Sequence, residues 1–300
     1  MDAERSMITL ADGRTVEVLT EGPPDGLPLV IHHGTPGGGL VTYPPKAEAE
    51  LARGLRAIHF ARPGYGDSTP QPGRAVADVA GDVEGILDAL GVATFITWGA
   101  SGGGPHALAC AALLPDRCLA AATIAGVAPS NAEGLDWLAG MGPENIEEFG
   151  AARRGAADLT AFLEKEAAGL GNLTGADIID GLGGLIGDAD KAVLTGEYAD
   201  YQASALKASV RTGIAGWRDD DIAFVADWGF PLGPAGLPVP VALWQGDDDR
   251  MVPFSHGQWL AARVPGAQVH LLPGEGHLSL AERHYGEILD GLLRLAGLGG

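Results

Sequence analysis

The 300-residue chain is poor in cysteine, with only Cys110 and Cys118. Two thiols in a chain of this length do not make a disulfide framework, so we expect both to be buried and reduced. Basic residues are also few, with 19 Lys and Arg against 39 Asp and Glu and a formal net charge of −20. Such an acidic chain repels phosphate backbones and anionic membrane faces, which argues against nucleic acid or a membrane as partner. Solubility is the simpler explanation of the charge.

Long apolar runs are missing as well. No stretch approaches the ~18 residues that a membrane-spanning helix requires. The first five residues, Met-Asp-Ala-Glu-Arg, contain acidic side chains and lack the apolar segment of a signal peptide. These features predict a cytoplasmic enzyme, and they leave its oligomeric state and its small-molecule or other substrate open.

Several motifs for cofactors and metals are absent too. The chain has no G-K-[ST] of a P-loop, and a G-x-G-x-x-G fingerprint that started at Gly99 would need glycine where Ser101 stands. There is no H-E-x-x-H, and the adjacent His32 and His33 have no acidic or cysteine partner at ligand spacing. We therefore expect neither a metal ion nor a cofactor.

What is present is an alternation of strands and helices. Short apolar or alternating runs predict strands over residues 6–10, 14–20, 29–33, 57–60, 95–98, 119–124, 241–244 and 268–272. Helical patterns lie over residues 45–53, 75–90, 105–114, 255–263 and 279–295. The first two strands form a hairpin around Asp12 and Gly13. The alternation predicts an α/β fold with a mostly parallel central sheet and helices on both faces.

The alternation stops in the middle of the chain. Between about residues 129 and 240 we find helical pieces, such as 157–168 and 203–210, separated by glycines and without a convincing strand. This predicts a helical insertion into the sheet domain. We expect residues 1–128 and 239–300 to form the two parts of the core, and residues 129–238 to form the insertion.

The strongest chemical signal is Gly-Ala-Ser-Gly-Gly at residues 99–103, which has the form G-x-S-x-G between a predicted strand and a predicted helix. A serine at such a sharp turn projects above the sheet, and the helix N-terminus favours developing negative charge beside it. Ser101 is thus a candidate nucleophile. The alternative is a glycine-rich start of a helix without chemistry.

A second glycine-rich segment, His-Gly-Thr-Pro-Gly-Gly at residues 33–38, directly follows a predicted strand. Backbone amides in a loop of small residues can approach a substrate oxygen closely. One amide from this loop, with Thr35 as the candidate, and the amide of Gly102 would make a two-donor oxyanion hole. The alternative is a tight turn that only needs glycine.

Candidate partners for the serine follow the last two predicted strands. Three aspartates, Asp247, Asp248 and Asp249, come after the strand at 241–244, and His277 lies in a glycine-flanked loop after the strand at 268–272. A carboxylate at a strand end can hold a histidine in the right tautomer, and the histidine can act as base. The order serine, aspartate, histidine is that of the α/β-hydrolase triad.

These motifs resemble those of the α/β-hydrolase superfamily, in the branch with a His-Gly-x-Pro-Gly-Gly oxyanion loop. The resemblance also covers Arg-Pro-Gly-Tyr-Gly-Asp-Ser at residues 62–68, and so nearly the whole chain. It implies Asp249 as the functional acid, because the family's aspartate lies three residues after the glycine and four before the proline. It further implies that the insertion at 129–238 is a cap. Similarity to proline iminopeptidases is partial, because those enzymes typically have tryptophan where this chain has Gly102.

The resemblance implies a serine hydrolase that cleaves a carboxylic ester or related acyl bond, with Ser101, His277 and Asp249 as the triad. Three alternatives stay open: an aminopeptidase of the proline iminopeptidase type, a C–C hydrolase or biosynthetic enzyme with the same triad, and a non-catalytic ligand-binding protein. The aminopeptidase would need acidic cap residues near the pocket, for which the chain offers Glu133, Glu144, Glu147 and Glu148. Candidates for contact with the substrate are His33, Gly34, His106, Trp137 and Trp217.

Overall fold

The computed structural model describes residues 3–38, 40–233 and 237–298. The described residues form an eight-stranded sheet in the order β1-β2-β4-β3-β5-β6-β7-β8. Its strands are β1 (Glu4–Thr9), β2 (Thr15–Glu21), β3 (Leu27–His32), β4 (Leu55–Phe60), β5 (Phe95–Ala100), β6 (Cys118–Ile124), β7 (Val241–Gly246) and β8 (Gln268–Leu272). The pairs β1–β2 and β2–β4 are antiparallel and all others are parallel. The predicted mostly parallel sheet is therefore confirmed, strand by strand.

Helices cover both faces of the sheet because successive residues of a strand point to opposite sides. Leu29 and Ile31 pack with α11 (His277–Leu295) and with Ala49 of α1 (Pro44–Leu51). Val30, between them, packs on the other face, which is covered by α2 (Val79–Ala89), α3 (Gly103–Leu113) and α10 (Phe254–Arg263). A 3₁₀ turn, η1 (Val76–Asp78), precedes α2. Both cysteines are buried and free, as expected.

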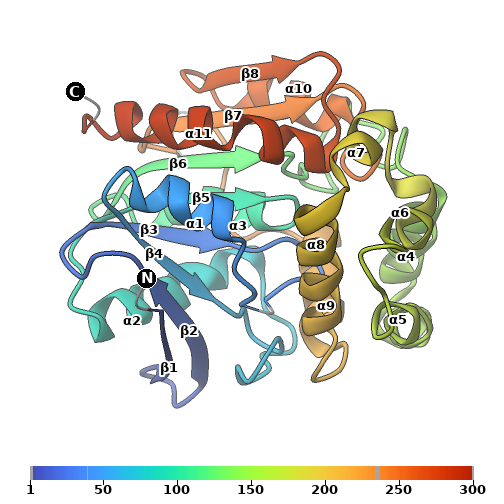
Figure 1. Cartoon of the computed structure of the whole chain (residues 1–300), viewed down its shortest axis with the longest axis horizontal. Helices are drawn as coiled ribbons and strands as arrows, with labels where there is room; N and C mark the ends of the chain where they lie inside the picture. Colours follow the sequence, from blue (N-terminus) through green and yellow to red (C-terminus); the bar gives the residue numbers. More distant parts are fainter. Residues whose placement is uncertain (1–2, 39, 234–236, 299–300) are drawn as a thin grey trace.

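Between β6 and β7 the described residues form helices and no strand. These are α4 (Pro143–Arg154), α5 (Ala156–Leu170), α6 (Ile178–Leu182), η2 (Gly183–Leu185), α7 (Asp188–Val193), α8 (Gly196–Ser209) and α9 (Ala215–Val225). Figure 1 shows them grouped at one end of the sheet, beyond the carboxyl ends of the parallel strands. The predicted helical insertion thus lies over the edge where ligands bind in open α/β sheets. Residues 39 and 234–236, which belong to the predicted oxyanion-loop region and insertion, lie outside the described residues.

A buried carboxylate joins the insertion to the sheet domain. Asp220 of α9 is fully buried, and its oxygens lie 2.6 Å from Arg62 Nη2 and 2.8 Å from Arg74 Nη2. The hydroxyl of Tyr65 donates a third bond at 2.9 Å. Burial alone would raise the pKa of Asp220, but Arg62 and Arg74 outweigh it and hold the pKa well below its usual value of 3.8. Asp220 is therefore ionised and fixes α9 against the loop that follows β4.

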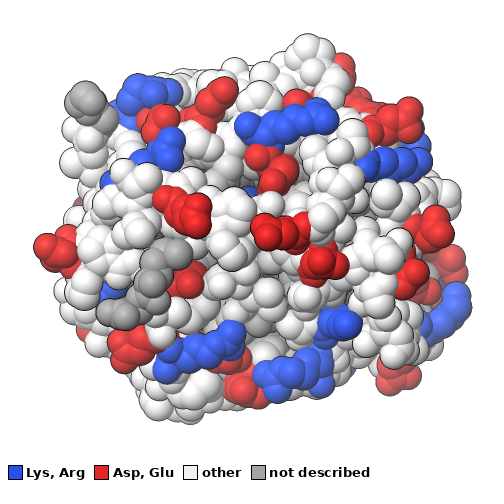
Figure 2. All heavy atoms as spheres, viewed as in Figure 1, with Lys and Arg blue, Asp and Glu red and all other residues white. Residues whose placement is uncertain are grey.

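The surface in Figure 2 carries acidic and basic side chains interspersed over one face of the molecule. Within the described ranges, no helix has the length and apolar character needed to cross a membrane. The mixed charges on this face agree with the charged composition of the chain.

Asp220→Ala should lower the free energy of unfolding by about 3–5 kcal/mol, because it leaves two buried guanidinium groups without their carboxylate. The pKa of Asp220 is depressed by folding, so its contribution is present above pH 3.8 and is lost as pH falls below that value. Urea unfolding from pH 3 to 7 measures both effects. Asp158→Ala, at the exposed ion pair with Arg154, is the control and should cost less than about 1 kcal/mol. Equal losses in the two variants would contradict the assigned role of Asp220.

Candidate active site

The strand-to-helix turn between β5 and α3 holds Ser101 in the left-handed region, with φ 55°. The amide of Ser101 donates to the carbonyl of Ile124 at 2.9 Å, which ties the turn to β6. A Cβ on Gly99 would collide with the carbonyl of Gly103, and a Cβ on Gly103 would collide with that of His32. Both glycines of the motif are therefore required by the tightness of the turn. A non-glycine residue in this conformation is unusual, and such residues cluster at functional sites.

His277 and Asp249 lie side by side, with 2.8 Å between His277 Nδ1 and Asp249 Oδ2. Both are buried, although they come from the start of α11 and the loop after β7. The other carboxylate oxygen of Asp249 accepts the amides of Met251 at 2.9 Å and Val252 at 2.8 Å. The Gln245 side chain donates to Oδ2 at 3.0 Å. Three donors besides the imidazole thus hold this carboxylate in one orientation toward His277.

The charge of Asp249 also sets the protonation of His277. Burial lowers the pKa of the imidazole, but the charge and hydrogen bond of Asp249 and the charge of Asp190 outweigh it and raise the pKa above 6.5. The carboxylate therefore stabilises the imidazolium that forms when the histidine takes up a proton.

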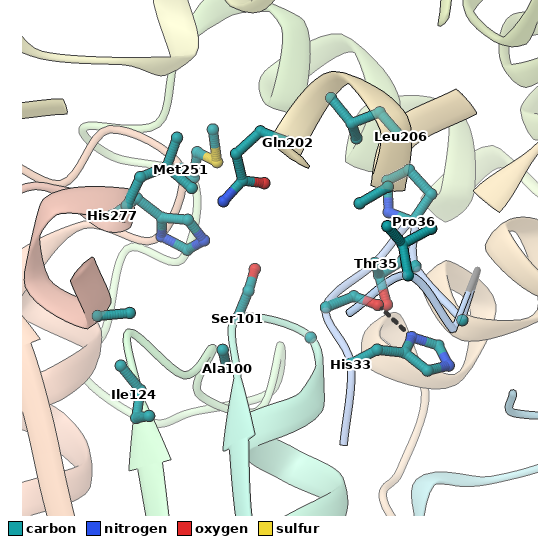
Figure 3. A pocket seen from close by; sticks show the side chains of 18 of the residues that line it. His33, Thr35, Pro36, Ala100, Ser101, Ile124, Gln202, Leu206, Met251 and His277 are labelled. Atoms are coloured by element: carbon teal, nitrogen blue, oxygen red, sulfur yellow. Dashed lines mark hydrogen bonds between the residues drawn. The ribbon is translucent and has the colours of Figure 1, made fainter. Parts of the chain in front are cut away.

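Ser101, in the turn between β5 and α3, and His277, at the start of α11, line the same cavity. Figure 3 shows the Ser101 side chain pointing into the cavity, with His277 on one side and Thr35 on the other. No hydrogen bond joins the serine hydroxyl to the imidazole in the described part of the chain. Hydrogen bonds between a nucleophile and its base are often long without substrate and shorten in the reacting complex.

Two backbone amides beside Ser101 are free. Neither Thr35 N–H nor Gly102 N–H donates a hydrogen bond within residues 3–38, 40–233 and 237–298, and both residues line the cavity. A Cβ on Gly102 would come within 2.5 Å of Thr35 Oγ1 and 3.0 Å of Phe224. The side chain that is missing at residue 102 thus lets Thr35 approach the nucleophile turn closely.

Arg62 holds the loop that carries Thr35. Its guanidinium donates to the carbonyls of His33 at 2.6 Å and Gly34 at 2.9 Å, and to the hydroxyl of Thr35 at 3.0 Å. That hydroxyl in turn donates to Asp220 at 2.8 Å. Arg62 and Asp220 thus bind two carbonyls and the hydroxyl of this segment, while the amide of Thr35 donates to no partner in the described residues.

The three consecutive aspartates have three different partners. Asp249 alone contacts His277 in the described structure, as the family spacing implies. Asp247 accepts the amide of Gly274 at 2.7 Å. Asp248 accepts the amide of Ala189 at 3.2 Å, at the start of α7 in the insertion. The other two aspartates therefore bind neighbouring segments rather than the imidazole.

The cavity has a volume of about 370 Å³ and is lined by both the core and the insertion. Of the predicted contact residues, His33, Gly34 and Trp217 line it. The prediction was wrong for His106 and Trp137, which lie outside its lining. The buried ring of His106 is 3.6 Å from Asp220, and the Trp137 indole donates to the carbonyl of Ala128 at 2.6 Å. Adjacency to Ser101 could not reveal which side of α3 faces the cavity.

Sequence reasoning missed several residues that line the cavity. They include Gln202 and Leu206 of α8, Met251 of the loop between β7 and α10, and Asp221 of α9. In Figure 3, Gln202, Leu206 and Met251 face Ser101 across the cavity. Only Asp221 had a signal, since it belongs to three consecutive acidic residues, 219–221, within a helical segment. The described residues contain no group of three His, Cys, Asp or Glu side chains placed to hold a metal ion.

Comparison with known proteins extends the resemblance to relatives and to solved structures. The chain is 29% identical over 253 residues to a non-heme chloroperoxidase from Streptomyces lividans, with 83% of each chain covered. It is 29% identical over 150 residues to a proline iminopeptidase from Arabidopsis thaliana, which covers 47% of this chain and 39% of that protein. A carboxylesterase structure from Bacillus subtilis superimposes with a TM-score of 0.66 at 19% identity, over 98% of this chain and 92% of the other.

One family model accounts for most of the sheet, the serine turn and the inserted helices together. A family model of the alpha/beta hydrolase fold matches residues 28–283, from β3 into α11. Because that match covers most of the sheet and all of the insertion, the chain belongs to the α/β-hydrolase fold family.

Proposed function

We propose that the chain is a serine hydrolase that cleaves a carboxylic ester, or a related acyl bond, of a small molecule. The supporting observation is the shared cavity of Ser101 and His277, with the imidazole held 2.8 Å from the carboxylate of Asp249. The free amides of Thr35 and Gly102 lie on the same cavity, as an oxyanion hole requires. The esterase fold neighbour and the residue types are consistent with this chemistry.

The mechanism has two steps. Ser101 Oγ attacks the carbonyl carbon while His277 takes the hydroxyl proton, and the negative oxygen binds the two amides. His277 then gives the proton to the leaving group, and an acyl-enzyme forms on Ser101. Water attacks this ester with His277 again as base. The bond between the acyl carbon and Ser101 Oγ breaks, His277 returns the proton to Oγ, and the acid product leaves. Asp249 orients His277 and stabilises it while it is charged.

An aminopeptidase is the second candidate, because acidic side chains line the cavity. Glu148 accepts a bond from the Trp217 indole at 2.6 Å, and both oxygens of the buried Asp221 lack a donor in the described structure. Burial and the charge of the neighbouring Glu148 raise the pKa of Asp221 well above its usual value. A substrate ammonium group beside the two carboxyl groups would favour their ionised forms. Aminoacyl arylamides should then react faster than their N-acetylated forms, and Glu148→Gln should reduce that preference.

Ser101→Ala should lower kcat by ~10⁶-fold, because the attacking atom is gone. The melting temperature should change little, since the hydroxyl makes no hydrogen bond within the described chain. The measurement is a panel of acyl esters and arylamides, with fluorophosphonate labelling read by mass spectrometry. Hydrolysis at the wild-type rate by a folded Ser101→Ala variant would contradict the mechanism. Absence of label on wild-type Ser101 would favour a ligand-binding protein.

Asp249→Asn should lower kcat by ~10⁴-fold, because the amide cannot stabilise the imidazolium and allows the wrong tautomer. Asp247→Asn and Asp248→Asn are the matched controls, since neither residue contacts His277 in the described part of the chain and each asparagine keeps a side-chain oxygen that can accept the amide of Gly274 or Ala189. Both should keep most of the activity, with at most a shift in melting temperature. A severe loss at residue 247 or 248 with residue 249 spared would show that the acid is wrongly assigned.

The rate constant kcat/KM should rise with pH through one ionisation whose midpoint lies above 6.5. The base must be neutral, and Asp249 raises the pKa of His277 above that value, so activity is lost as pH falls through the raised pKa. Asp249→Asn should move the midpoint of its residual activity to lower pH. A profile that stays flat from pH 5 to 8 would remove His277 from this role.

A further inference from the structure

Asp190, in the inserted helix α7, binds the start of the helix that carries His277. Its Oδ2 accepts the amide of His277 at 3.1 Å, and its Oδ1 accepts those of Leu278 at 2.8 Å and Ser279 at 2.9 Å. These are three of the four amides that a helix start leaves without an intrahelical partner. A residue 87 positions away in sequence thus caps α11 and fixes the backbone of the candidate base.

The contact is close and is closed to solvent. Asp190 is fully buried, and a Cβ on Gly276 would collide with its carboxylate. No Lys or Arg of the described residues forms an ion pair with Asp190, and Lys191, its neighbour, lies near Asp188 instead. Burial raises the pKa of Asp190, and the amides of Ser279 and Leu278 and the charge of the nearby His277 act against that rise.

The start of α7 is itself bound by Asp248, in the loop after β7. Asp248 accepts the amide of Ala189, and a Cβ on Gly187 would collide with the Asp248 carboxylate. Asp248 therefore secures α7, Asp190 of α7 secures α11, and Asp249 beside Asp248 binds the side chain of His277. The base is held at both its backbone and its ring, and one of these restraints comes from the insertion.

We infer that Asp190 is a positioning residue, which keeps the imidazole of His277 in place relative to Ser101. The position of His277 then depends on where the insertion lies. This rests on the proposed function, in which His277 activates Ser101. Without the carboxylate, three amides in the first turn of α11 lose their acceptors, and the turn can fray. A displacement of about 1 Å at a reacting group can cost ~10²-fold in rate.

The experiment compares Asp190→Ala, Asp190→Asn and the control Asp188→Asn, which changes a fully exposed carboxylate on the same helix. The rate of Ser101 modification by a fluorophosphonate is measured against pH, together with hydrogen exchange of the amides of residues 277–279. We expect Asp190→Ala to lower the rate by about 10–100-fold and to speed exchange at the three amides. Asp190→Asn should lose less, and Asp188→Asn should stay within about twofold of wild type.

The pH midpoint separates positioning from a merely structural role. The charged groups that face His277 are Asp249, from the loop after β7, and Asp190, from α7. Asp190→Asn keeps an acceptor but removes one negative charge, so the midpoint of modification should move to lower pH while the melting temperature stays near wild type. If Asp190→Ala does not fold, this shift in Asp190→Asn decides.

Wild-type rate, midpoint and amide exchange in both Asp190 variants would overturn the inference. A melting temperature that falls with no change in rate or midpoint would also overturn it, because Asp190 would then be structural only. Failure of the proposed function looks different, since wild-type protein would then not be modified at Ser101 at all.

Discussion

The buried carboxylate of Asp220 is the constraint on which the candidate site depends. It compensates two guanidinium groups, Arg62 and Arg74, that would otherwise be charged and unpaired in the interior. Arg62 then has its remaining donors fixed on the carbonyls of His33 and Gly34. The same arginine thus contacts both Asp220 of the insertion and the loop of the sheet domain that carries Thr35.

The site is assembled from segments that pure sequence order keeps far apart. The β5–α3 turn supplies the serine, the loop after β7 supplies the acid, and the first residue of α11 supplies the histidine. Each sits at the carboxyl edge of the sheet because parallel strands end there together. The insertion adds wall residues and, through Asp190, a restraint on the histidine. Core and insertion thus both contribute to the candidate site.

The central strands could be predicted because a parallel sheet buries both faces, so strands such as β3, β5, β6 and β7 are short apolar runs between turn residues. The outer pair β1 and β2 could be predicted from its turn at Asp12 and Gly13. The serine turn could be recognised because Gly99 and Gly103 have no room for a side chain. The contacts of Asp190 and Asp220 could not be predicted, since they cross the boundary of an insertion whose placement no local pattern encodes. The same lack of a local pattern explains the wrong prediction for Trp137. Its side chain is apolar, as that of a pocket residue would be, but its indole donates to the carbonyl of Ala128 in its own segment.

Because Asp190 belongs to the insertion, the same segment supplies residues that line the cavity and a residue that binds the backbone of His277. A chimera that exchanged residues 129–238 for those of a relative would acquire a new pocket wall but would lose the acceptor for three amides of α11. Gly276, whose backbone lies against the Asp190 carboxylate, would lose that neighbour, and Asp248 would lose its contact with Gly187. Recombination that keeps α7 with the core, and exchanges only the helices around it, respects the boundary that the hydrogen bonds define.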